Sequence, residues 1–94
     1  MINDELLTLR NLGKTSAQWL HATGIHSRDD LRQRGPVEAY CAVRARGFRA
    51  SKSLMFAIAG ALEDVHWNEL PADYKEQLRE QLKEHQMSAH SRRD

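Results

Sequence analysis

The apolar run from Leu54 to Leu62, LMFAIAGAL, constrains the fold of this chain more than any other feature. On a helix it is apolar on nearly every side, which is typical of a helix at the centre of a fold. It is far too short to span a bilayer, so we expect no membrane partner. Inside it, Gly60 costs roughly 1 kcal/mol of helix propensity relative to alanine. We therefore expect a neighbouring side chain or backbone segment to fill the space beside Gly60.

The rest of the chain also predicts helices, because it has no alternating β-branched run and no Asn-Gly or Asp-Gly hairpin signal. We expect a short first helix carrying Leu6 to Leu9, then helices over about 15–23, 28–34, 36–47, 52–65 and 71–85. The predicted fold class is all-α: a compact bundle of about five to six short helices beginning with a helix-hairpin-helix-like unit. We expect it to occupy residues 1–86, before a polar tail, 87–94, that frays.

Composition limits the classes of protein that this chain can belong to. With 94 residues it can build one compact domain with a modest core. The single Cys41 excludes an intramolecular disulfide framework and a zinc site made of cysteines. The N-terminus, MINDELLTLR, carries acids and lacks the apolar stretch of a signal peptide. We therefore expect a cytoplasmic protein.

The net charge of +1 conceals an asymmetry between the two halves of the chain. Residues 1–53 carry 9 Lys and Arg against 5 Asp and Glu, whereas residues 54–94 carry 5 against 8. A basic first half favours an anionic partner such as nucleic acid. A solvated surface of mixed charge is the more common meaning of so small an excess.

The stretch LRNLGKTSAQWL, residues 9–20, breaks the helical pattern at a glycine followed by a lysine. A helix that starts after such a turn can present backbone N–H groups and the positive end of its dipole to a phosphate. Lys14 would add charge, and Thr15 or Ser16 a hydroxyl donor. The spacing is similar to that of helix-hairpin-helix motifs, which usually have Gly-hydrophobic-Gly in the turn. Here Asn11 takes the first glycine's place, and asparagine tolerates a left-handed backbone better than most residues.

Two interpretations of this turn are about evenly matched: a purely structural turn, in which Gly13 shapes the backbone, and a phosphate site. A second basic group surrounds Gly47 and Phe48. It is either another phosphate-contacting patch beside an exposed Phe48 or, as we favour, a solvated loop with Phe48 folded inward. The candidate nucleic-acid-binding residues are Asn11, Gly13, Lys14, Thr15, Ser16, Arg44, Arg46, Arg49 and Lys52.

We find no constellation typical of an enzyme or a metal site. His21 and His26 are five residues apart, as are His85 and His90, and neither pair has helical i,i+4 spacing. Cys41 lies at an apolar helical position without a partner base. His66-Trp67 is interpreted as a packing anchor at a helix exit, with the Trp ring burying a large apolar area. We therefore predict no catalytic residue, no metal ligand and no cofactor.

Several separated motifs, in order, resemble one known family. The segments NLGKTSAQWLHATGI, DLRQRGPVEAY, SKSLMFAIAGAL and HWNELP look like the C-terminal domain of the TfoX/Sxy family of bacterial competence regulators, over about residues 6–82. The resemblance implies an all-helical domain with a helix-hairpin-helix-like beginning. In full-length members this domain follows an N-terminal α/β domain, and they act with the cyclic-AMP receptor protein in expression of DNA-uptake genes. We expect here a stand-alone domain of the C-terminal type, starting at Met1, rather than a fragment.

Two functional hypotheses follow. In the first, the chain is a non-enzymatic regulatory binding module that contacts DNA phosphates weakly and without sequence preference. In the second, the hairpin is purely structural, and a helix face contacts a transcription-related protein or a second copy.

Overall fold

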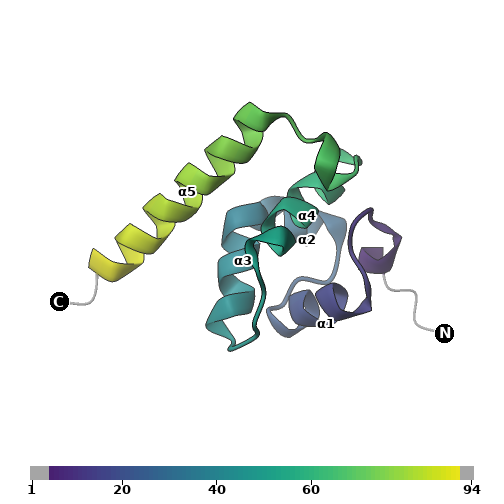
Figure 1. Cartoon of the computed structure of the whole chain (residues 1–94). Helices are drawn as coiled ribbons and strands as arrows, with labels where there is room; N and C mark the ends of the chain where they lie inside the picture. The colour runs from purple at the N-terminus through teal and green to yellow at the C-terminus, as the bar shows by residue number, and fades with distance from the viewer. Residues whose placement is uncertain (1–4, 92–94) are drawn as a thin grey trace.

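The computed structural model describes the backbone of residues 5–91 and the side chains of residues 5–87. Over this range the chain is all-helical and has no strand, which confirms the predicted fold class (Figure 1). Five α-helices and two short 3₁₀ helices, η1 and η2, follow one another. In chain order they are η1 Glu5–Thr8, α1 Lys14–Ala22, α2 Arg28–Arg34, α3 Pro36–Ala45, α4 Lys52–Glu63, η2 Trp67–Glu69 and α5 Ala72–Ser91.

Helix α4 is the central element, as its apolar sequence predicted. It packs against α3, α2 and η2, and half of its residues are buried. The side chains of Met55 and Ile58 are fully inaccessible to solvent. The space beside Gly60 is filled, as predicted. A Cβ at this position would lie 2.6 Å from Asn11 Nδ2 and 2.8 Å from the Val65 carbonyl oxygen. The glycine thus lets the hairpin turn and the chain after α4 approach the helix closely.

The unit at the N-terminus begins with a short helix, as predicted. Residues Glu5–Thr8 form a 3₁₀ helix, closed by i+3 bonds such as that from the Leu9 N–H to the Leu6 carbonyl. The Thr8 hydroxyl donates to the Glu5 carbonyl at 2.6 Å and ends this short turn. The hairpin is therefore a 3₁₀ helix, a turn and then an α-helix, with Leu6 and Leu12 buried in the common core.

Helix α5 is long and leans away from the other helices at its C-terminal end (Figure 1). Its buried residues Leu78 and Leu82 attach it to the bundle, where it contacts α3. The Arg79 guanidinium also lies over the Phe56 ring of α4, 5.3 Å from the centroid. The expected end near His85 is wrong: the helix continues to Ser91, because no glycine or proline interrupts residues 72–91.

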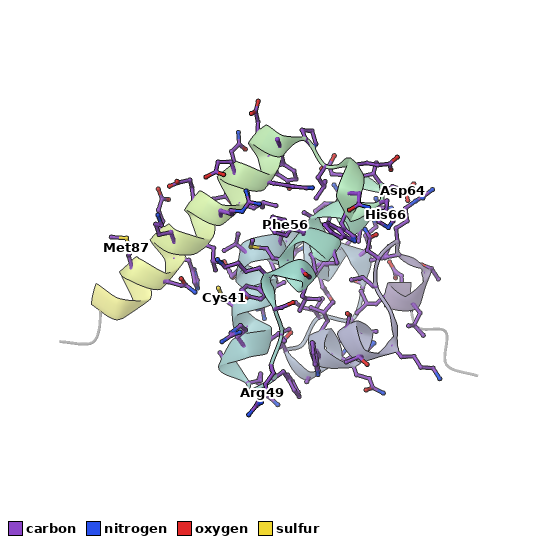
Figure 2. The ribbon with its side chains drawn as sticks, viewed as in Figure 1. Cys41, Arg49, Phe56, Asp64, His66 and Met87 are labelled. Carbon is purple, nitrogen blue, oxygen red and sulfur yellow. The ribbon has the colours of Figure 1, made fainter. Side chains whose placement is uncertain are left out.

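The expected polar tail, 87–94, is therefore helical through residue 91, and its last three residues lie outside the described range. Met87 is 62% exposed on this helix (Figure 2). Across residues 5–91, no helix has both the length and the apolar content needed to cross a bilayer.

Candidate nucleic-acid interface

The start of α1 has no side chain that caps its backbone N–H groups. Gly13 is the N-cap residue, and having no side chain it provides no capping hydrogen bond. Lys14 and Thr15 are exposed, Ser16 is half-buried, and the first turn carries no acidic residue. The structure thus brings four predicted residues together in one accessible helix start, with the polarity that favours an anion.

Gly13 does not shape the turn in the way that the sequence suggested. Its backbone is extended, with φ −103° and ψ −172°, and nothing lies within 4 Å of a Cβ built on it. Neither a left-handed conformation nor crowding requires glycine here. The left-handed residue of the turn is Asn11, with φ 70°, so the prediction that Gly13 shapes the backbone is wrong and the tolerance expected of Asn11 is confirmed.

Asn11 fastens the turn to the centre of the fold. Its Nδ2 donates to the Val65 carbonyl at 3.0 Å and to the Ala57 carbonyl at 3.4 Å. Its Oδ1 accepts from the Trp67 N–H at 3.3 Å. The side chain therefore satisfies backbone groups of α4 and of the segment after it, which positions α1 but directs the amide inward.

The basic connection between α3 and α4 combines structural and exposed cations. Arg44 Nη1 donates to the Ala50 carbonyl at 2.7 Å and braces the loop. Phe48 is half-buried and its ring stacks on Trp19, with centroids 5.6 Å apart, so the inward orientation that we favoured is correct. All four cations of this connection are exposed: Arg44, Arg46, Arg49 and Lys52.

One groove joins the two predicted groups. Asn11 and Ser16 of the hairpin line it together with Arg49 of the basic connection, in a volume of about 440 Å³ between α1 and α4. The other six predicted residues do not line it: Gly13, Lys14, Thr15, Arg44, Arg46 and Lys52. The sequence therefore identified parts of the groove from two distant segments without showing that they meet.

Sequence reasoning missed the far wall of this groove. His66 and Trp67 line it, and Trp67 is 38% exposed, so part of the ring that was expected to pack remains accessible to solvent. His66 instead caps η2: its Nδ1 accepts from the Asn68 N–H at 3.2 Å, and its own N–H donates to Glu69 Oε1 at 3.2 Å. The H-x-x-E spacing of this capping box is the signal that the sequence offered.

The other side chains considered for catalysis or metal binding make contacts within the protein. His21 and His26 stack with ring centroids 4.9 Å apart, and their Nδ1 atoms lie 2.7 Å from each other in a hydrogen bond. Cys41 is partly buried between α3 and α5 (Figure 2), and this burial raises the pKa of its thiol. Among the described residues, no three His, Cys, Asp or Glu side chains gather as metal ligands would.

The comparisons with known proteins agree with this architecture. The family model of the TfoX C-terminal domain matches residues 2–82. Two crystal structures have a similar fold: an uncharacterized protein from Listeria monocytogenes in a triclinic form, and a protein of unknown function from the same organism in a tetragonal form. The first is 28% identical, with a TM-score of 0.75 over 79% of this chain and 84% of that one. The second has the same identity and TM-score over 80% of this chain and 93% of that one. No curated protein matches.

Proposed function

Because the chain belongs to the TfoX C-terminal domain family, we propose that it is a non-enzymatic, cytoplasmic regulatory module that contacts DNA phosphates through the start of α1. This role needs no catalytic residue and no cofactor. It makes the domain a non-specific DNA-positioning element in transcription regulation, related to the competence regulators. Contacts of this type set the position of a protein on the duplex and carry no sequence information.

The observation that carries the proposal is the uncapped N-terminus of α1. The Lys14, Thr15 and Ser16 N–H groups precede the first intrahelical hydrogen bond, which runs from Ala17 to the Gly13 carbonyl at 2.9 Å. The Lys14 side chain is exposed beside them. A phosphate oxygen at this position would accept from the amides and lie close to a cation, which is the arrangement that stabilises anions at helix starts.

Fluorescence anisotropy with a labelled DNA duplex at two salt concentrations tests the proposal. We expect weak binding at low salt that falls about tenfold between about 50 and 200 mM salt, the dependence expected for roughly two neutralised phosphates. Lys14→Glu should weaken it further, whereas Lys83→Glu, which makes the same charge change on α5, should have little effect. Absence of binding at low salt, or equal effects of the two variants, would contradict the hairpin site.

A second function, a protein-interaction module, is favoured by the exposed side of α5. This side forms a shallow groove of about 360 Å³ lined by four carboxylates, namely Asp73, Glu76, Glu80 and Glu84. One of them, Glu76, pairs with Arg79 at 3.1 Å. Such a surface suits a basic partner, which we would assign to a transcription-related protein. Pull-down from bacterial lysate with and without nuclease separates the two functions. A partner that survives nuclease and is lost on Glu76→Lys/Glu80→Lys favours this alternative.

A further inference from the structure

The connection between α3 and α4 forms a basic surface on the molecule. Residues 44–53, which we call the basic connection, carry four cations and no carboxylate, and all four charged side chains are exposed. Of these four, only Arg44 makes a hydrogen bond within the described residues, to the Ala50 carbonyl oxygen. None of the four forms an ion pair with a described carboxylate. The positive charge of the basic connection is therefore not neutralised by the part of the chain that the structure describes.

The exposed side of α5 carries the opposite charge. Four carboxylates line its shallow groove, together with two glutamine side chains. The cations of Lys75 and Arg79 lie over aromatic rings of other elements, 5.4 and 5.3 Å from the ring centroids. Glu76 pairs with Arg79 at 3.1 Å. The other three carboxylates form no ion pair among the described residues: Asp73, Glu80 and Glu84.

These two surfaces lie apart in the molecule. Figure 1 shows the connection between α3 and α4 at the lower end of the bundle, and α5 along the upper left. In Figure 2, Arg49 of the connection lies well away from Met87 on α5. Exposed charges interact only over about 10 Å at ordinary salt concentrations. One copy of the chain therefore cannot pair its own two surfaces, whereas two copies can.

We propose that the chain associates with itself through these surfaces, the acidic side of α5 in one copy docking on the basic connection of another. Charge complementarity selects a second copy as the occupant, because the chain itself carries both surfaces. The contact joins exposed charged side chains, so it is weak, transient and sensitive to salt. The inference names a partner for the α5 surface on which the alternative function rests, and it does not depend on DNA binding at the start of α1.

Sedimentation velocity of the full chain at high protein concentration, in about 50 and about 500 mM salt, tests this inference. We expect association at the lower salt concentration that is largely lost at the higher one. Glu80→Lys/Glu84→Lys and Arg46→Glu/Arg49→Glu should each weaken it about tenfold, because attraction becomes repulsion. A chain with all four substitutions should associate again, since the two surfaces have then exchanged their signs. Thermal melting of each variant confirms that the fold persists.

Matched variants separate a specific contact from an effect of net charge. Glu38→Lys/Glu63→Lys and Arg10→Glu/Arg32→Glu make the same charge changes at exposed positions elsewhere, and both should retain association. Equal losses in these controls would overturn the inference. A chain that stays monomeric at low salt, or a four-substitution chain that does not associate, would also overturn it.

The outcomes also separate this inference from the proposed function and its alternative. A monomeric chain that still captures a nuclease-resistant partner through α5 overturns the self-association and leaves the alternative function standing. Self-association that needs both surfaces, without such a partner, supports the inference and removes the need for a different protein on α5. Since no DNA is present in the sedimentation experiment, the anion position at α1 has no influence on either result.

Discussion

Two helices of the first half, α1 and α2, begin in opposite ways. The start of α2 is closed by the protein's own oxygens: the Arg28 N–H donates to Glu5 Oε2 at 3.1 Å, and the Asp30 N–H donates to Ser27 Oγ at 3.0 Å. Two acids also occupy its first turn. The start of α1 has a glycine in place of the capping serine and no acid in its first turn.

The two helices differ in whether the free N–H groups of their first turn have an acceptor within the protein. A carboxylate already sits at the N-terminus of α2, which is the stabilising arrangement for an anion. At the start of α1, no side chain of the described residues accepts a hydrogen bond from these N–H groups. The comparison thus makes the start of α1 an accessible anion position and that of α2 a filled one.

The largest expected effect concerns how α1 is held in place. Asn11→Ala removes three hydrogen bonds to backbone groups and puts a less tolerant residue at φ 70°. We expect a loss of about 2–4 kcal/mol in the free energy of unfolding, from the unsatisfied groups and the left-handed backbone. Asn11→Gly, which relieves only the backbone, should be less destabilising by about 1 kcal/mol. Equal urea midpoints for the two variants would contradict the left-handed contribution.

The next effect concerns the surface on which this turn packs. Gly60→Ala gains about 1 kcal/mol of helix propensity, but its Cβ would approach Asn11 Nδ2 and the Val65 carbonyl. Because a backbone oxygen cannot move aside as a flexible side chain can, we expect a net loss of about 1–3 kcal/mol. Chemical denaturation measures it, with Ala57→Gly as a control for propensity alone. Stabilisation by Gly60→Ala would show that the turn is not held tightly against α4.

The third prediction converts α1 into a helix that starts as α2 does. Gly13→Asp fits the extended backbone and the open space at this position, and it supplies the missing cap. We expect unchanged or slightly raised stability, by a few tenths of a kcal/mol, together with a roughly tenfold loss of duplex affinity. Gly13→Ser is the neutral control, which caps without adding charge and should lose less affinity. Retained duplex binding in Gly13→Asp would contradict the anion position.

The smallest effect concerns the filled start of α2. The backbone N–H of His26 donates to the Asp30 carboxylate at 3.0 Å, and this hydrogen bond lowers the pKa of Asp30. A lowered pKa means that the contribution of Asp30 to stability is complete above the ordinary carboxyl value, about 3.9. It is lost as the pH falls through the folded-state value. The stability difference between wild type and Asp30→Asn should therefore be constant near neutral pH and shrink in acid, in denaturation series at several pH values. A difference that grows in acid would reverse the assigned sign.

The sequence predicted the elements governed by local rules. The continuous apolar run identified α4 as central, and S-x-x-D predicted the capped start of α2, although the Asp30 carboxylate receives the N–H of His26. It also indicated that Gly60 has a close neighbour. The first two follow from periodicity or from contacts a few residues apart, and the third follows from the low helix propensity of glycine.

The sequence could not supply contacts between distant segments. Nothing local shows that the side chain of Asn11 reaches Val65 and Trp67, so the role of shaping the turn was assigned to the neighbouring glycine. Likewise, the meeting of Ser16 with Arg49 in one groove depends on how α1 packs beside α4. The exposure of Trp67 also follows from packing, since the apolar character of an indole alone favours burial.

Amide chemical-shift mapping on adding a short DNA duplex at low salt tests the central claim most directly, because it reports on the N–H groups themselves. We predict that the largest shifts belong to Lys14, Thr15 and Ser16, that they disappear in Gly13→Asp, and that the start of α2 at Arg28 does not respond. Shifts confined to α5, or an equal response from the starts of α1 and α2, would contradict it.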